Sequence, residues 1–229
     1  MFPWLETVPA DRLRDVRDTS LAKLAREALM DRILQGELPP GARVSEPEVC
    51  ERLGISRVPV REALRELESS GLVVSRKHAG VFVREIDAAE VRDLYELRGL
   101  YDGFAGARAA ALQAPERKTL VQALDESIAR MKTAEQQGVV RDYYAENLRF
   151  HWLIVEASGN AQLAAAYRGV VQKLHLARLK NLSQGLGMRT SIQEHEAIAR
   201  AIAQGDIGPA GQLLGQHVGD AYERLTQAR

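Results

Sequence analysis

Three histidines in the second half of the chain have the residue type and the surroundings of metal ligands. His151, His195 and His217 each lie among apolar residues in a separate stretch with helical spacing, so each is expected on the inward face of its own helix. Asn147 precedes His151 by four residues and therefore shares its helix face. Imidazoles that converge with a side-chain oxygen make a site for zinc or a similar divalent ion, with coordination positions left open.

Two interpretations of these histidines compete. Each one taken singly is better explained as a core residue whose hydrogen bonds are satisfied within the protein. Three of them on three helices of one small bundle favour a shared metal site instead. Zinc is the first expectation, but neutral imidazole also accepts nickel, cobalt or manganese, so the residues do not specify the metal.

A second chemical pattern is basic. Arg57, Arg61 and Arg65 are spaced four residues apart and therefore line one face of a helix. The apolar stripe on another face consists of Val60, Ala63, Leu64 and Leu67. An arginine fork matches the acceptors of guanine, and a helix N-terminus favours phosphate, so such a helix suits the major groove of DNA. For one helix considered alone, solvated surface arginines are the simpler explanation.

The helix that carries these arginines has clear start and stop signals. Ser56 is expected at the N-cap, where its hydroxyl can accept a hydrogen bond from an amide of the first turn. Pro59 is tolerated within that turn, and Gly71 ends the helix. Residues 44–53 predict a second short helix just before it, joined through Gly54.

A β-hairpin is expected after Gly71, with strands at residues 72–74 and 81–83 and a basic turn between them. Two short helices followed by such a hairpin form a winged helix-turn-helix pattern, which favours DNA binding over solvated arginines. The residues expected to contact DNA are Ser56, Arg57, Arg61, Arg65, Lys77, His78 and Gly80.

Bulk charge does not by itself suggest a nucleic-acid partner. The chain has 31 Lys and Arg against 31 Asp and Glu, so its formal net charge is zero. The basic character near residue 60 is therefore a local patch. Tight binding would need two such patches on one DNA, which favours a homodimer.

The remaining composition excludes several classes of protein. No apolar run approaches the length of a membrane span, and the N-terminus lacks the order of a signal peptide. Cys50 is the single cysteine, so an internal disulfide framework is excluded and a reducing cytoplasm is expected. Cys50 is expected in a small buried slot of the second short helix.

The expected fold is mostly α, with an N-terminal winged helix-turn-helix and then an all-α antiparallel bundle. The expected divisions are an arm at 1–19, a DNA-binding domain at 20–86, which opens with a helix to about residue 35, and a helical effector-binding and dimerisation domain at 87–229. Its helices are expected near 88–112, 116–136, 139–158, 161–182, 190–204 and 207–227, separated by glycine or proline.

Residues 33–73 resemble the DNA-binding domain of GntR-family bacterial transcription regulators. The match consists of Gly36, the Pro40-Gly41 turn, Ser56-Arg57, the run from Pro59 to Leu64 and Gly71-Leu72. In that family the arginines matching Arg57 and Arg61 contact DNA, and the glycine matching Gly80 lies at the wing. Pro47 stands where some branches have a further DNA-reading arginine, so no such role is assigned there.

The second half resembles the FCD domain, the helical effector domain of the FadR-like branch of this family. The match consists of Arg98, Phe150-His151, the run from Ala157 to Asn160, Glu194-His195, Ala201-Ile202, Gly205-Asp206 and His217. The resemblance implies a divalent metal on the three histidines and a small organic acid beside it. Asn147 stands where the family usually has aspartate, so this site would lack one negative charge.

Arg98 has two open interpretations. In the resembling domains an arginine at this place can reach the effector's carboxylate, and a guanidinium fork fits a carboxylate well. The alternative is an ion pair with Glu96, Asp102 or another helix.

The resemblance implies a ligand-responsive transcription regulator without enzymatic activity, in which a carboxylic acid releases a repressor from its operator. Activation instead of repression stays open, as do the effector and the operator sequence. A metal-dependent hydrolase on a DNA-binding head is a second hypothesis, but Glu194 and Glu196 flank His195 and are expected to point away from it. A third is an architectural DNA-binding protein whose histidines only pack.

Overall fold

The structure, a computed structural model, describes residues 2–4, 21–178 and 187–227. The chain divides into two compact units. Among the described residues, the first contains 21–87 and 172–178, and the second contains 2–4, 88–171 and 187–227. Most of the expected N-terminal arm lies outside the described residues.

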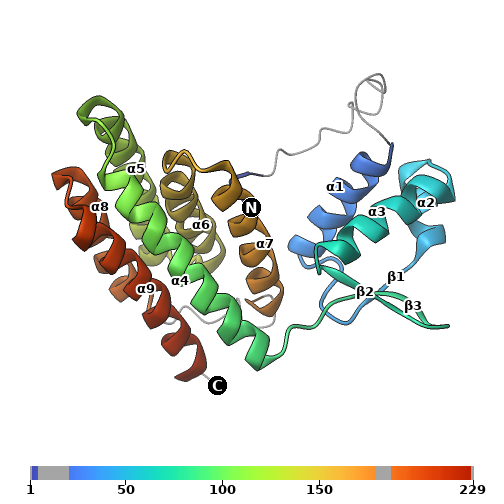
Figure 1. The fold of residues 1–229 in the computed structure, drawn as a ribbon. Coiled ribbons are helices and arrows are strands. Elements are labelled where there is room, and N and C mark those ends of the chain that lie inside the picture. Colours follow the sequence, from blue (N-terminus) through green and yellow to red (C-terminus); the bar gives the residue numbers. More distant parts are fainter. Residues whose placement is uncertain (1, 5–20, 179–186, 228–229) are drawn as a thin grey trace. The chain divides into compact units, whose positions relative to one another are not determined.

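The first unit contains the expected winged helix-turn-helix (Figure 1). Its elements are α1 (Leu21–Leu34), β1 (Arg43–Val44), α2 (Glu46–Leu53), α3 (Arg57–Ser69), β2 (Val73–Arg76) and β3 (Gly80–Val83). The expected stripe of α3, from Val60 to Leu67, is buried against this unit's core. Gly71 adopts a φ of +74°, which favours glycine, at the point where the chain leaves α3 for the wing.

The wing is a three-stranded sheet in the order β1-β3-β2, with both pairs antiparallel. The hairpin was expected, and its strands pair in register from Val73 opposite Val83 to Arg76 opposite Gly80. The third strand, β1, was not expected. It is two residues long and is recognisable only because β3, distant in the sequence, pairs with it through Val44 and Val81.

Two local predictions for this unit were wrong. Ser56 occupies the N-cap of α3, but its side chain makes no capping hydrogen bond. Pro59 is the third helical residue and has no N–H, which removes a usual target of an N-cap hydroxyl. Cys50 is only half-buried and does not fill a buried slot.

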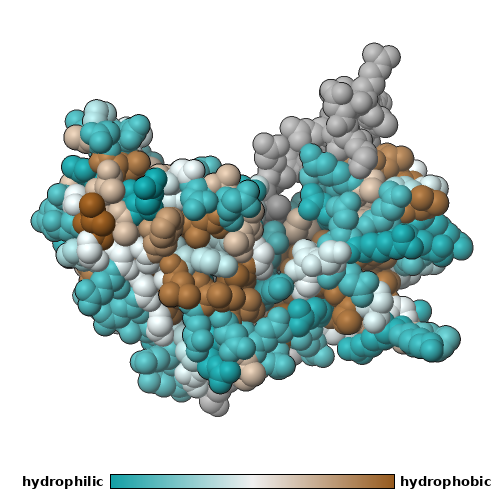
Figure 2. Space-filling model, viewed as in Figure 1, coloured by the Kyte–Doolittle hydropathy of each residue, from teal (hydrophilic) through white to brown (hydrophobic). Residues whose placement is uncertain are grey.

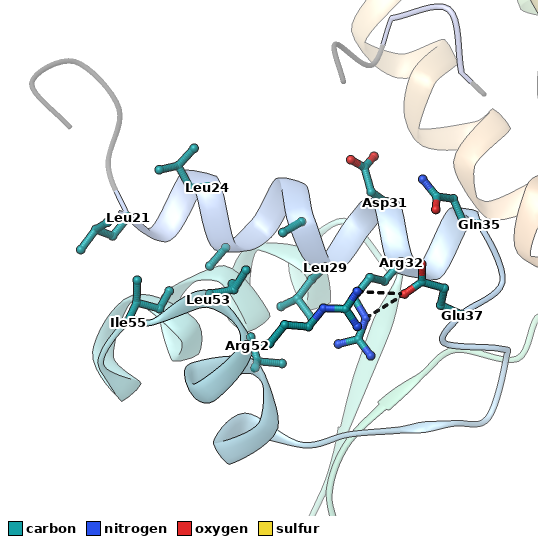
Figure 3. Close-up of a pocket in the computed structure, with 13 residues that line it drawn as sticks. Leu21, Leu24, Leu29, Asp31, Arg32, Gln35, Glu37, Arg52, Leu53 and Ile55 are labelled. Carbon is teal, nitrogen blue, oxygen red and sulfur yellow. Dashed lines mark hydrogen bonds and ion pairs between the residues drawn. The ribbon is translucent and has the colours of Figure 1, made fainter. Parts of the chain in front are cut away.

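A pocket of about 390 Å³ lies between α1 and α2 (Figure 3). Its wall is largely apolar, with Leu24 and Leu29 from α1 and Leu53 from α2. At its edge, Arg32 and Arg52 both approach the carboxylate of Glu37, at 3.3 and 3.6 Å. None of the candidate metal or DNA-contacting residues lines this pocket.

From residue 88 onward, the described residues form helices joined by short turns. The helices are α4 (Ala88–Ala110), α5 (Ala114–Gln137), α6 (Val140–Ala157), α7 (Ala161–Arg178), α8 (Met188–Gln204) and α9 (Ile207–Gln227). The residues of α7 from Gln172 onward belong to the first unit, and the other helices belong to the second. These bounds agree with the expected helices to within two residues, except at residues 179–182, which lie outside the described part. None of the described helices has the length and apolar character needed to cross a membrane.

Helices α4 and α9 pack antiparallel through glycines at very short range. A Cβ added to Gly103 would lie 3.2 Å from the backbone oxygen of Gly211, and one added to Gly99 would lie 3.6 Å from that of Gly215. Gly106 is tighter still, at 2.9 Å from the oxygen of Ala210. The two backbones can approach this closely only because side chains are missing from the seam.

The first residues of the chain pack on the second unit. Phe2 is buried, and its ring centroid lies 4.9 Å from that of Trp4. Trp4 in turn lies 4.7 Å from Trp152 of α6, measured between ring centroids. The sequence left the position of Trp4 open, and the structure places it on Trp152.

We expect Gly106→Ala to lower the free energy of unfolding by about 1–3 kcal/mol, because the new methyl group would collide with backbone at Ala210. Gly219→Ala, on α9, is the matched control. A Cβ there meets nothing within 4 Å, so stability should be unchanged or should rise by up to about 1 kcal/mol. Denaturant unfolding of both variants measures the difference. A Gly106→Ala variant as stable as Gly219→Ala would contradict the close seam.

Candidate metal centre and nucleic-acid interface

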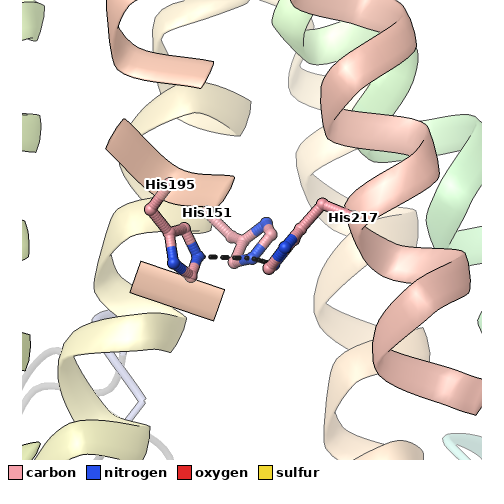
Figure 4. Close-up of side chains that lie close together, drawn as sticks. All are labelled: His151, His195 and His217. Carbon is pink, nitrogen blue, oxygen red and sulfur yellow. Dashed lines mark hydrogen bonds between the residues drawn. The ribbon is translucent and has the colours of Figure 1, made fainter. Parts of the chain in front are cut away.

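The three histidines converge from three helices of the second unit (Figure 4). His151 lies on α6, His195 on α8 and His217 on α9, and all three are buried. Nε2 of His151 lies 3.3 Å from Nε2 of His217 and 3.4 Å from Nε2 of His195. The inward orientation expected from helical spacing is therefore confirmed, and the rings meet at one point.

Two carboxylates determine which nitrogen of each ring carries the proton. Nδ1 of His151 donates to Oδ1 of Asp102 at 2.9 Å, and Nδ1 of His217 donates to Oε2 of Glu194 at 2.6 Å. An ionised carboxylate only accepts hydrogen bonds, so the proton sits on Nδ1 in both rings. Nε2 of each of these two rings is then directed at the centre of the cluster.

The third ring, that of His195, is held in its neutral form. Burial, reinforced by the neighbouring His217 and His151, lowers the pKa of His195 well below its ordinary value. Three buried imidazoles thus bring one nitrogen each to the same place. Converging lone pairs repel one another unless a cation or a proton lies between them, so the donor set fits a metal ion.

The spacing of the nitrogens fits a metal as well. Zinc–nitrogen bonds of about 2.0–2.1 Å place two ligands of a tetrahedral ion about 3.3–3.4 Å apart. The two short Nε2 separations in the cluster are 3.3 and 3.4 Å. One potential ligand atom from each of the three rings lies within 4.8 Å of the others. Small ring movements would therefore be enough to complete three-fold coordination.

Asn147 lies at the same point. Its side-chain nitrogen is 3.3 Å from Nε2 of His195, and the residue is buried. The nitrogen and oxygen of an amide exchange places when χ2 rotates by half a turn. The carbonyl oxygen can therefore face the cluster as a neutral ligand.

The expected direction of Glu194, away from His195, is confirmed, but its contact with the histidine cluster was not expected. Glu194 does leave the face of its neighbour His195, but α9 lies on that side and brings His217 to it. Arg224 also binds both carboxylate oxygens of Glu194, at 2.8 and 2.9 Å. These hydrogen bonds outweigh burial and lower the pKa of Glu194. A carboxylate held in this way supports His217 and is poorly placed to act as a general base. Glu196 instead pairs with Lys132 at 2.6 Å.

Arg98 forms the ion pair that was one of its two expected roles. Its Nε lies 3.1 Å from Oδ2 of Asp102, and both side chains are buried. The hydroxyl of Tyr167 donates to the same carboxylate at 3.4 Å. Burial raises the pKa of Asp102 to about 6, although Arg98 and His217 oppose the shift. Asp102 thus links Arg98 to His151.

The candidate DNA-contacting arginines are all exposed on α3 of the first unit. Arg57, Arg61 and Arg65 lie on the side opposite the buried stripe. Nε of Arg61 pairs with Glu46 of α2 at 2.9 Å, with both side chains partly in solvent. Exposed pairs of this kind contribute about 0–1 kcal/mol, whereas a bidentate guanine contact contributes about 1–3 kcal/mol. Guanine can therefore displace Glu46 from Arg61.

The wing is tied to α3 and presents a basic tip. Glu68 accepts hydrogen bonds from the backbone N–H and the hydroxyl of Ser75, at 2.7 and 2.9 Å. Lys77 and His78 lie exposed in the turn between β2 and β3. Gly80 has a φ of +103°, and a Cβ there would lie 3.2 Å from Nε of Arg43. Glycine therefore lets the arginine side chain cross the hairpin.

Several supporting residues were missed by sequence reasoning. Glu46, Glu68 and Tyr167 act across elements that are separated in the sequence, so no local spacing identifies them. Asp102 had a signal, because it follows Arg98 by four residues and shares its helix face. Its hydrogen bond to His151 had no such signal.

Comparison with protein families gives two matches. Residues 21–83 match the model described as bacterial regulatory proteins, gntR family. Residues 93–220, more than half of the chain, match the FCD domain. The candidate DNA-contacting residues fall in the first match, and Arg98, Asn147 and the three histidines fall in the second.

Similar proteins are described as transcription regulators. The chain is 32% identical to a "Probable D-xylose utilization operon transcriptional repressor" of Paenarthrobacter nicotinovorans, over 87% of this chain and 86% of that protein. A solved structure of a GntR transcriptional regulator from Rhodococcus sp. RHA1 has a TM-score of 0.75 at 25% identity and covers 92% of this chain and 100% of that one. The E. coli protein McbR/YncC has the same fold, with a TM-score of 0.76 at 22% identity, covering 92% and 99% of the two chains.

Proposed function

Because this chain belongs to the GntR family of bacterial DNA-binding transcription regulators and carries an FCD domain, we propose that it is a homodimeric repressor released from its operator by a small carboxylic acid. Residues 20–86 would read DNA. Residues 87–229 would bind the effector beside a divalent metal and pair the subunits. The family and its relatives are regulators and not enzymes.

The convergence of three buried Nε2 atoms is the observation that carries the effector site. His151, His195 and His217 would hold the ion, and Asn147 would add a neutral oxygen. Such an ion supplies a Lewis-acidic centre that attracts a carboxylate or hydroxyl oxygen of a ligand.

Two carboxylates offset the missing charge at Asn147. Asp102 and Glu194 each accept the Nδ1 proton of a histidine ligand, which makes that imidazole a stronger donor to a cation. Negative charge thus reaches the ion through His151 and His217 instead of through a charged ligand. This arrangement leaves the ion more electrophilic toward an anionic effector than an aspartate ligand would.

Arg98 is the proposed second anchor of the acid. The arginine fork has five N–H donors, and the ion pair with Asp102 uses its Nε. The terminal nitrogens can therefore hold a carboxylate while Nε stays on Asp102. An acid between Arg98 and the ion would be fixed at both ends, which suits hydroxy acids, sugar acids and dicarboxylates.

Release from DNA requires that the effector prefer one arrangement of the dimer. Each subunit would place its α3 helix on one half-site of the operator. Two subunits would bind together, because the basic patch of one α3 is too small for tight binding on its own. An acid changes DNA affinity only to the extent that it binds the DNA-free arrangement more tightly.

Protein purified without chelator should contain about one divalent metal ion per chain, and His151→Ala/His195→Ala should contain none. Removing two of three nitrogen ligands leaves too few donors to retain an ion. Elemental analysis gives the ratio. Zinc added to stripped wild type should raise the melting temperature, since a hundredfold excess over Kd stabilises by about 2.7 kcal/mol.

Two further variants sharpen the metal test. His78→Ala removes an exposed histidine of the wing and should leave the metal content unchanged. Asn147→Asp adds a charged ligand and should strengthen zinc binding. Equal zinc binding by wild type and by His151→Ala/His195→Ala would rule out the histidine cluster as the metal site.

An organic acid should weaken operator binding by zinc-loaded protein about 5–150-fold, the usual range of allosteric coupling. The DNA is the sequence that the protein selects from a random pool, and the acids tested are lactate, malate, citrate and gluconate. D-xylose is an uncharged comparison suggested by the relative's name. Release by D-xylose alone, or equal release from His151→Ala/His195→Ala, would contradict an acid bound at the ion.

Arg57→Ala and Arg61→Ala should each weaken binding to the selected DNA by about 1–3 kcal/mol and relax base preference near the contact. Lys77→Ala should weaken binding to all sequences and flatten its dependence on salt. Arg149→Ala, exposed on α6, is the matched control and should have no effect. Fluorescence anisotropy over a salt series separates these cases. Unchanged affinity for DNA in both arginine variants would show that α3 is not the helix that contacts the bases.

A further inference from the structure

One arginine of α3 is held by a carboxylate of the neighbouring helix. Hydrophilic residues cover much of the visible surface of the first unit, out to the wing (Figure 2). On this surface, Nε of Arg61 donates to Oε2 of Glu46 at 2.9 Å, which joins α3 to the first residue of α2. Arg57 and Arg65 form no ion pair within the part of the chain that the structure describes. Arg61 therefore differs from both of its neighbours on the exposed side of α3.

The pair with Glu46 leaves the outer end of the Arg61 guanidinium unused. Arginine has five N–H donors, and Glu46 accepts only the one on Nε. Among the described residues, the two terminal nitrogens of Arg61 have no hydrogen-bond partner. These nitrogens form a fork that matches O6 and N7 of guanine. Arg61 can thus contact guanine while its Nε stays on Glu46, so displacement of Glu46 is not required.

Glu46 is the better anchored member of the pair. Ser45 is the N-cap of α2, and its hydroxyl accepts a hydrogen bond from the backbone N–H of Glu48 at 3.4 Å. A carboxylate in the first turn of a helix is stabilised by the positive end of the helix dipole. The Glu46 side chain is 30% exposed, and the Arg61 side chain is 58% exposed. The less exposed carboxylate therefore fixes the direction of the more exposed guanidinium.

A held arginine meets unrelated DNA differently from a free one. Unrelated DNA is bound through its phosphates, and each cation that contacts a phosphate releases a counterion. Glu46 already neutralises the charge of Arg61 and restricts its reach, so Arg61 gains little from a phosphate. A guanine in front of the fork instead receives a side chain that has little rotamer freedom left to lose.

We propose that Glu46 is a positioning residue for base reading, which aims the fork of Arg61 at guanine and keeps that arginine off the phosphates of unrelated DNA. This inference rests on the proposed function, because it takes α3 as the helix that reads the operator. It goes beyond that function by naming a residue that sets the ratio of operator affinity to unrelated-DNA affinity through another side chain.

The first test compares Glu46→Ala with Glu46→Gln. Both variants lose the same negative charge, but only glutamine keeps a side-chain oxygen that can accept the Nε proton of Arg61. Glu46→Ala should lower the ratio of affinity for the selected DNA to affinity for unrelated DNA about three- to tenfold, and Glu46→Gln should keep it within about twofold of wild type. Fluorescence anisotropy at one salt concentration measures both affinities.

A control variant removes a carboxylate that has no such role. Glu51→Ala changes an exposed residue of the same helix and should leave the ratio of affinities unchanged. Circular dichroism checks that all variants keep their helix content.

The second test follows a single guanine of the selected DNA. Each guanine in turn is replaced by 7-deazaguanine, which lacks the N7 acceptor. The guanine read by Arg61 is the one at which this replacement weakens wild type about fivefold or more but leaves Arg61→Ala unaffected. At that guanine the replacement should weaken Glu46→Gln as much as wild type and should weaken Glu46→Ala clearly less. A residue that only supported the fold of α2 would change affinity for every DNA alike.

The outcomes separate this inference from the proposed function. A wild type that selects no DNA sequence, or an Arg61→Ala variant with unchanged affinity, would count against base reading by Arg61 itself. If Arg61→Ala binds the selected DNA more weakly but no guanine meets the criterion, or Glu46→Ala keeps both the ratio and the sensitivity to the replacement, only the role of Glu46 is overturned. Stronger binding of the selected DNA by Glu46→Ala at an unchanged ratio would also overturn it, because guanine would then displace Glu46.

Discussion

The second unit is organised around the meeting of three imidazoles in a buried space. Each Nε2 presents a lone pair to the others, and this arrangement is unfavourable until something positive lies among them. The protein holds the rings there by their other nitrogens. Asp102 fixes His151, and Glu194, itself held by Arg224, fixes His217. Helices α4, α6, α8 and α9 must therefore keep their relative positions for the cluster to exist.

The close seam between α4 and α9 helps to keep those positions. Glycines at 103 and 211 bring the two backbones together, so α9 carries His217 and Arg224 at a fixed depth while α4 carries Asp102. Bulkier residues at the seam would push the helices apart and separate the carboxylates from their imidazoles. The close packing of α4 against α9 thus keeps the carboxylates in contact with their imidazoles.

Helix α4 has two different faces. Arg98 and Asp102 lie on its buried side, and Leu97, Leu100 and Phe104 lie on its exposed side. In the proposed mechanism an acid that binds Arg98 would change the contacts on the inner face of this helix.

The sequence by itself determined the element order, the helix bounds, the winged helix-turn-helix pattern and the inward direction of His151, His195 and His217. These features follow from local periodicity and from turn residues, which act within a few positions of the chain. The same reasoning failed for Ser56, where a proline removed the capping donor, and for β1, which exists only through its partner strand.

Only the tertiary structure decided which carboxylates bind His151 and His217 and which side of α4 is exposed. Glu194 turns away from His195, as helical geometry requires, yet it meets His217 because another helix lies on that side. Leu97, Leu100 and Phe104 are as apolar as the residues that α4 buries, so their types alone do not say which face is outside. Contacts between helices depend on how the helices pack, and packing is a property of the whole fold that no local spacing contains.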